Sequence, residues 1–114
     1  MRSEYIQVLT SIDSAEKAAV IAQTLLEKRL AACVQILGPI QSHYWWQGQR
    51  EQSQEWLCLA KTRQELYPAV ESAIRAVHPY QTPEILATPI LAGLAEYLAW
   101  LDQEVCPLRS ESVG

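Results

Sequence analysis

The chain has 114 residues, 49% of them hydrophobic, and 9 basic residues against 13 acidic ones give it a net charge of −4. This length predicts one compact domain without room for a second core. The basic residues are few and scattered, which argues against a nucleic-acid partner. No apolar run approaches the roughly 18 to 20 residues of a membrane span, and residues 1–12 lack the pattern of an export signal.

Three cysteines stand far apart in the sequence, at Cys33, Cys58 and Cys106. An odd number of cysteines without a close pair is typical of free thiols in a reducing compartment and not of a disulfide framework. We therefore expect a cytoplasmic protein with no membrane segment.

A strand and a helix are predicted at the start of the chain. Residues 4–10 are rich in β-branched and aromatic side chains, which is typical of a strand, and residues 11–30 change to helical periodicity. Asp13 and Glu16 have the spacing of a capping box, which predicts that Asp13 begins the helix.

A long hairpin is predicted next. Residues 31–61 have strand character on both sides of a short polar turn at Gly48. The glycine–proline pair at 38–39 predicts a bulge or bend in the first of the two strands. Glu51 and Glu55 are expected at the solvated tip of this hairpin.

The second half of the chain repeats the pattern of strand, helix and strand. Thr62 and Glu65 have capping-box spacing and predict the start of a second helix. This helix ends at His78, because the proline that follows disfavours helical geometry in the residue before it. Residues 84–91 predict a fourth strand, which its own proline confines to an edge or end of the sheet. Residues 94–105 predict a last short helix.

This order of elements predicts a ferredoxin-like α+β sandwich, βαββαβ, with a long hairpin between its second and third strands and a C-terminal helix. Residues 1–107 are its single predicted domain, and residues 108–114 are a polar tail. Helices cover only one face of such a sheet, yet the strand at 55–61 is apolar on both faces. A second apolar face on so small a protein predicts self-association through the sheet.

Four segments resemble the CutA family of divalent-cation tolerance proteins. They are EKRLAACVQILGPIQSHYWWQG at 27–48, LCLAKT at 57–62, HPYQTPEI at 78–85 and YLAWL at 97–101. The resemblance implies a homotrimer with the sheets turned inward, an architecture similar to the PII signalling proteins, and a link to copper and other divalent cations. Gln81 departs from the glutamate that is common in this family, and a neutral amide binds a cation less well.

His78 and Cys33 are the candidate ligands for Cu(II) or another divalent cation. A hairpin centred near Gly48 places Cys33 and Cys58 about 20 Å apart within one chain, so a metal site needs a neighbouring subunit or another part of the fold. Alternatively, Cys33 is a small buried apolar residue, and His78 is a structural residue that donates to the last carbonyls of its helix.

A cleft between subunits is the second candidate site, lined by Lys61, Trp46, His78, Tyr80 and Glu84. Two prolines stiffen the corner around Tyr80, which lowers the entropy cost of holding polar side chains in place. An anion at Lys61 would meet its ammonium and the amides of the helix start. Alternatively, Lys61 extends along the strand end and Trp46 packs between subunits.

No nucleophile elbow, P-loop or paired-carboxylate motif occurs in the sequence, so we expect no catalysis and no required cofactor. Three functions follow from these patterns, and the last of them is a very stable assembly factor or scaffold that binds no small ligand. The first is binding of a divalent cation such as Cu(II), with a role in metal tolerance. The second is PII-like binding of a small anionic molecule in signalling.

Overall fold

The computed structural model describes residues 4–107 and has the predicted order of elements. The strands form one antiparallel sheet in the order β2-β3-β1-β4, which is the ferredoxin-like arrangement. The predicted tail at 108–114 lies outside the described residues. The elements are β1 Tyr5–Ile12, α1 Ala15–Glu27, β2 Cys33–Trp46, β3 Gln49–Arg63, the 3-10 helix η1 Gln64–Leu66, α2 Tyr67–Val77, β4 Ile85–Pro89 and α3 Ala95–Glu104.

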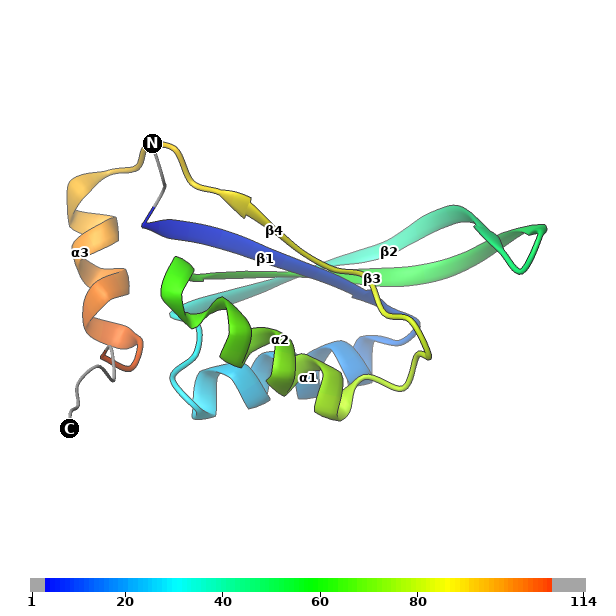
Figure 1. Ribbon diagram of the computed structural model, residues 1–114, viewed down its shortest axis with the longest axis horizontal. Helices are drawn as coiled ribbons and strands as arrows, with labels where there is room; N and C mark the ends of the chain where they lie inside the picture. Colours follow the sequence, from blue (N-terminus) through cyan, green and yellow to red (C-terminus); the bar gives the residue numbers. More distant parts are fainter. Residues whose placement is uncertain (1–3, 108–114) are drawn as a thin grey trace.

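The molecule has two layers. Helices α1 and α2 lie side by side under one face of the sheet, and α3 stands at one end of it (Figure 1). The hairpin of β2 and β3 continues past the ends of β1 and β4 at the opposite end of the molecule (Figure 1). Among residues 4–107, no helix has the length and apolar character needed to cross a membrane.

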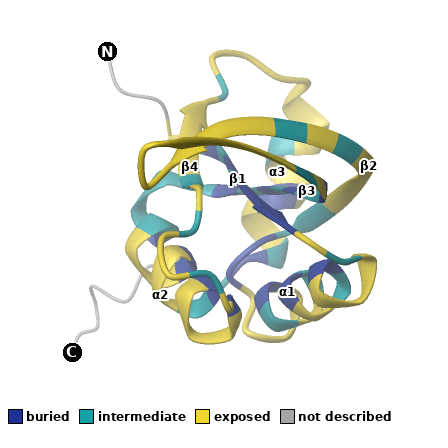
Figure 2. Cartoon of the chain, turned by 90° about the vertical axis from the view of Figure 1, so that its right-hand side faces the viewer, coloured by how far each residue is buried: buried dark blue, intermediate teal, exposed yellow. Residues whose placement is uncertain are grey.

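The hydrophobic core lies between the sheet and the two helices. Figure 2 shows the buried residues gathered there and the hairpin exposed along its outer part. Strands contribute alternate residues to this layer because successive side chains point to opposite faces. Its fully buried side chains include Val8, Ile12, Ile21, Leu25, Cys58, Val70, Ile74 and Leu101.

The opposite face of the sheet is also apolar, as predicted, and α1 and α2 lie on the other side of the sheet (Figure 1). Helix α3 reaches this face at one end, where Asp102 binds Tyr5 and Arg63. The strand pairing places Leu57 opposite Leu37, and Leu9 between Leu59 and Leu86. Leu37 is 49% exposed and Leu86 is 54% exposed. This leucine face is therefore open in the single chain.

The hairpin turn and its bulge lie where the sequence predicts them. Gln47 and Gly48 both have positive φ angles, 51° and 79°, as a two-residue turn of type I′ requires. The pairing of β2 with β3 shifts between Leu37 and Ile40, which confirms the irregularity at the glycine–proline pair.

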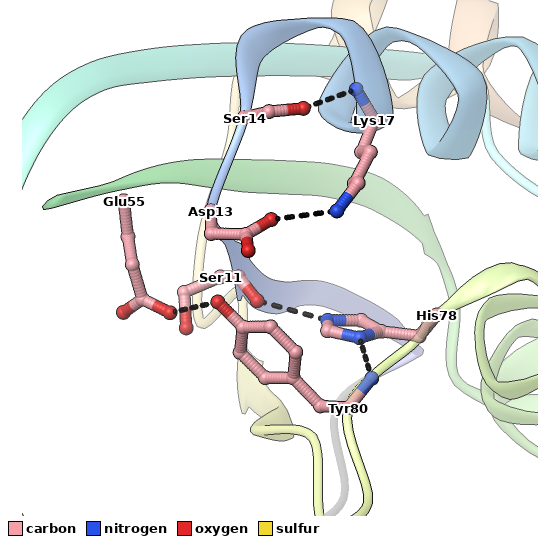
Figure 3. Close-up of polar contacts among 7 residues, drawn as sticks. All are labelled: Ser11, Asp13, Ser14, Lys17, Glu55, His78 and Tyr80. Carbon is pink, nitrogen blue, oxygen red and sulfur yellow. Dashed lines mark hydrogen bonds and ion pairs between the residues drawn. The ribbon is translucent and has the colours of Figure 1, made fainter. Parts of the chain in front are cut away.

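Neither helix begins at the predicted capping box. Ser14 caps α1 by accepting a hydrogen bond from the Lys17 amide, while Asp13 forms an ion pair with the Lys17 ammonium at 3.1 Å (Figure 3). Thr62 does not start α2, because β3 continues through it to Arg63. The Thr62 hydroxyl is buried and donates to the Leu30 carbonyl at 2.6 Å.

The predicted hairpin register is wrong by up to three residues. Cys33 pairs with Lys61 and Cys58 pairs with Ile36. The prediction centred the turn between residues 48 and 49, which put Cys33 near Gln64 and Cys58 near Pro39. The observed centre lies between residues 47 and 48, and the prediction made no allowance for the shift at the bulge. The three-residue offset along β2 corresponds to about 10 Å, not 20 Å, between the positions of the two thiols.

Candidate functional site

A cleft of about 830 Å³ opens where the hairpin leaves the rest of the sheet. Side chains from the hairpin form one wall, and residues 80–84, between α2 and β4, form the other. Within residues 4–107 none of the lining residues is a lysine or an arginine. The lining residues are Ser11, Ser42, His43, Tyr44, Trp45, Trp46, Glu51, Glu55, Tyr80, Gln81, Thr82 and Glu84.

Glu55 and Tyr80 join the two walls of the cleft. The Tyr80 hydroxyl donates a hydrogen bond of 2.7 Å to Glu55 Oε2 (Figure 3). Burial raises the pKa of the Tyr80 hydroxyl well above its ordinary value, and the hydrogen bond to Glu55 raises it further. Tyr80 therefore keeps its proton at neutral pH and serves as a donor to the carboxylate.

His78 holds Tyr80 in place from beneath the cleft. Its Nδ1 accepts a hydrogen bond from the Tyr80 amide at 3.3 Å, and its Nε2 lies 2.9 Å from the Ser11 carbonyl oxygen (Figure 3). A carbonyl can only accept, so Nε2 carries the hydrogen and Nδ1 the lone pair. The two rings also meet edge to face at 4.6 Å. Both ring nitrogens of this buried histidine are thus committed to the protein.

Glu84 is held at the edge of the same cleft. The Ser11 hydroxyl donates to Glu84 Oε1 at 3.1 Å, which ties the start of β4 to the end of β1. On the hairpin side, Tyr44 and Ser53 share a hydrogen bond of 3.2 Å between their hydroxyls. The cleft therefore has carboxylates and aromatic rings fixed by short polar contacts.

The structure separates the residues that the sequence analysis grouped together. Trp46, Tyr80 and Glu84 line the cleft, and His78 lies behind it. Lys61 does not reach the cleft of its own chain, because it lies six residues along β3 from Glu55, about 20 Å in an extended strand. Lys61 instead donates to the Gln35 side chain.

Cys33 also lies away from His78, at the α3 end of the sheet. It pairs with Lys61, and Lys61 pairs in turn with Gln7 of β1, whereas His78 contacts Ser11, four residues further along that strand. Burial raises the pKa of the neighbouring Tyr97 hydroxyl, and Cys33 adds to the rise. Among residues 4–107, no three histidine, cysteine, aspartate or glutamate side chains converge as a metal site. One chain therefore does not bring the two candidate ligands, Cys33 and His78, together.

Sequence reasoning missed the part that the hairpin plays in this cleft. Glu55 was expected at a solvated tip, yet it is only 5% exposed, because Tyr80 covers it. His43, Tyr44 and Trp45 also line the cleft. The run of three aromatic residues at 44–46 was the available signal, but it does not say which loop faces the hairpin.

Comparisons with known proteins agree with this fold. The family model "CutA1 divalent ion tolerance protein" matches residues 6–104. The divalent-cation tolerance protein CutA of Thermus thermophilus is 47% identical over 94 residues, which are 82% of this chain and 91% of that protein. Its namesake from Archaeoglobus fulgidus is 48% identical over 92 residues, 81% of this chain and 89% of that protein.

Solved structures give the same result. The Thermus thermophilus divalent cation tolerance protein superposes with a TM-score of 0.87 at 43% identity, covering 90% of this chain and 99% of that one. A structure described as the periplasmic divalent cation tolerance protein CutA from Archaeoglobus fulgidus has a TM-score of 0.85 at 43% identity, over 88% of this chain and 97% of that one. The chain therefore belongs to the CutA1 divalent ion tolerance protein family.

Proposed function

We propose that this chain is a non-enzymatic protein that binds a divalent cation, Cu(II) among them, and contributes to metal tolerance as a cytoplasmic homotrimer. The observation that carries the proposal is the charge of the cleft. Three carboxylates, Glu51, Glu55 and Glu84, line it, and no lysine or arginine does so within residues 4–107. Family membership agrees with this chemistry.

The donors in the cleft suit such an ion. Carboxylate oxygens bind divalent cations in general, and an imidazole such as His43 adds the nitrogen that Cu(II) favours. We prefer this group to His78 and Cys33, because both His78 nitrogens have protein partners and Cys33 lies at the other end of the sheet. Fewer than three donors converge within the described part of one chain, so we expect neighbouring subunits or water to complete the coordination.

The leucine face supports the homotrimer that the family resemblance implies. Leu37, Leu57, Leu59 and Leu86 form an open apolar surface on a chain of 114 residues, and burial of such a surface is worth about 25 cal/mol per Å². Three copies that turn these faces inward would cover them without adding another element. Such packing also brings parts of neighbouring chains close to each cleft.

A second candidate is PII-like binding of a small molecule. The volume of about 830 Å³ lies in the range of small-ligand sites, and this observation favours it. An anionic ligand would need a positive group, and Lys61 is the residue predicted for that role. It would have to come from a neighbouring chain, because Lys61 does not line the cleft of its own chain.

Calorimetric titration with Cu(II) tests the first proposal. Glu84→Gln should weaken binding about tenfold, because it removes one charged ligand and keeps the shape of the side chain. Cys33→Ser is the matched control and should leave the affinity unchanged. If Cys33→Ser abolishes binding and Glu84→Gln does not, the ion lies at the thiol end of the sheet and this assignment of ligands is wrong.

Two further measurements address assembly and compartment. Sedimentation equilibrium should give three times the mass of 12.9 kDa. Cell fractionation with a cytoplasmic and a periplasmic marker should find the chain with the cytoplasmic marker. A monomer, or a signal in the periplasmic fraction, would overturn that part of the proposal.

A further inference from the structure

The Glu55 carboxylate has no positively charged partner among residues 4–107. Glu55 is buried, and Oε2 accepts its one hydrogen bond, from the uncharged Tyr80 hydroxyl (Figure 3). Oε1 has no partner among residues 4–107, and no lysine, arginine or histidine pairs with the group there. Glu55 is only 5% exposed and its charge has no positive partner there, so a cationic group from outside the chain that reaches Oε1 would be favoured at this position.

Tyr80 contacts this carboxylate, and three more aromatic residues line the cleft further along the hairpin. Tyr44, Trp45, Trp46 and Tyr80 all line the cleft, and the Trp45 side chain is 71% exposed. The face of an aromatic ring attracts an organic cation and also packs against methylene groups. A bare metal ion makes little use of such walls, because it binds through oxygen, nitrogen or sulfur donors.

The size and charge of the cleft limit the class of ligand further. A volume of about 830 Å³ is large for a single ion but ordinary for a small organic molecule. Glu51, Glu55 and Glu84 come from two separate segments, the hairpin and the start of β4, so the negative charges are spread along the cleft. A ligand with several positive charges separated by flexible apolar segments would match both features.

We propose that the cleft binds a linear aliphatic polyamine, with its ammonium groups paired to the three glutamates and its methylene groups against the aromatic rings. The inference rests on the geometry of the cleft and not on metal binding, although both place a cation in the same cleft. Glu55 is the deepest contact, and Trp45 is the outer one.

Calorimetry with spermidine in buffer containing EDTA tests the proposal with metal ions removed. We expect binding to the wild-type chain, about tenfold weaker binding to Glu55→Gln and Glu84→Gln, and about threefold weaker binding to Trp45→Ala. Glu27→Gln, which removes an exposed charge at the end of α1, is the matched control and should bind like the wild type. The neutral diol 1,8-octanediol should give no heat.

Three results would overturn the proposal. They are the absence of spermidine binding to the wild type, an equal loss of affinity in Glu27→Gln and Glu84→Gln, and spermidine binding that is unchanged in both Trp45→Ala and Glu55→Gln. Circular dichroism of each variant shows that it is folded. Since EDTA is present throughout, failure here leaves the Cu(II) titration standing, and failure of that titration leaves this one standing.

Discussion

The two faces of β3 share one strand but differ in what covers them. Cys58 and Ala60 point toward the helices and are each 2% exposed, whereas Leu57 and Leu59 point away and are only half-buried. The residues are apolar on both faces. The difference in their exposure therefore arises because helices α1 and α2 cover only one of the two faces. The covered face accounts for the fold of the single chain, and the open face accounts for its expected assembly.

The largest expected effect concerns the open face. Leu57→Glu places a charge at its centre and should convert the proposed homotrimer to monomers, a threefold drop in mass by ultracentrifugation. The fold should persist by circular dichroism, because the helix-covered core is untouched. Val20→Glu, on the exposed side of α1, is the control and should keep the mass of the wild type.

The second prediction compares one truncation on each side of the sheet. Ile74→Ala opens a cavity in the covered core and should cost about 2–5 kcal/mol of unfolding free energy in guanidinium titrations. Leu86→Ala should cost less than about 1 kcal/mol in a monomeric background such as Leu57→Glu, because the side chain is half exposed there. Equal losses would mean that the single chain covers both faces equally well.

The third prediction concerns a polar group on the covered face. Thr62→Val removes the buried donor to the Leu30 carbonyl and should cost about 1–3 kcal/mol in the same titration. Thr24 makes a similar hydrogen bond to the Val20 carbonyl on α1, but in solvent. Thr24→Val should change the stability by less than about 0.5 kcal/mol. A loss in Thr24→Val as large as that in Thr62→Val would show that burial does not set the cost.

The smallest effect is expected at the Cys58 thiol. Burial raises its pKa from 9.0 to about 11. The folded protein disfavours the thiolate, so the contribution of Cys58 to stability is complete below pH 9 and is lost as the pH rises toward 11. In a chain carrying Cys33→Ser and Cys106→Ser, labelling by a disulfide reagent at pH 8 should require unfolding. Labelling at the same rate with and without guanidinium would contradict this.

The sequence predicted the order of the elements, because hydrophobic periodicity and turn residues such as Gly48 are local signals. The helix starts depended on more than local residue type. Asp13 and Ser14 are both good caps, and the extended backbone at Ser14 decided between them. The strand register depended on the exact centre of the hairpin turn and on a shift at the bulge, and no local pattern gives either to within a residue. That error moved Cys33, Cys58 and their partners along the sheet.

The candidate site was harder to predict than the fold, since its parts come from distant segments. Tyr80 and Glu84 belong to the rigid corner that the prolines mark, and they line the cleft. Glu55 is 25 residues from Tyr80 in the sequence, and their contact depends on how far the hairpin extends beyond β1. Lys61 was assigned to a cleft between subunits because it stands at a strand end beside a predicted helix start. Within one chain, strand geometry separates it from Glu55.

The length of the hairpin has a consequence for exchange with solvent. The pairing of β3 with β1 ends at Trp56, so residues 49–55 share backbone hydrogen bonds with β2 alone. A two-stranded ribbon opens more readily than a sheet flanked on both sides. Its amide groups should exchange hydrogen for deuterium quickly in an isolated chain and slowly where a neighbouring subunit packs against the ribbon. The exchange rate of residues 49–55 would therefore report dissociation of the subunits.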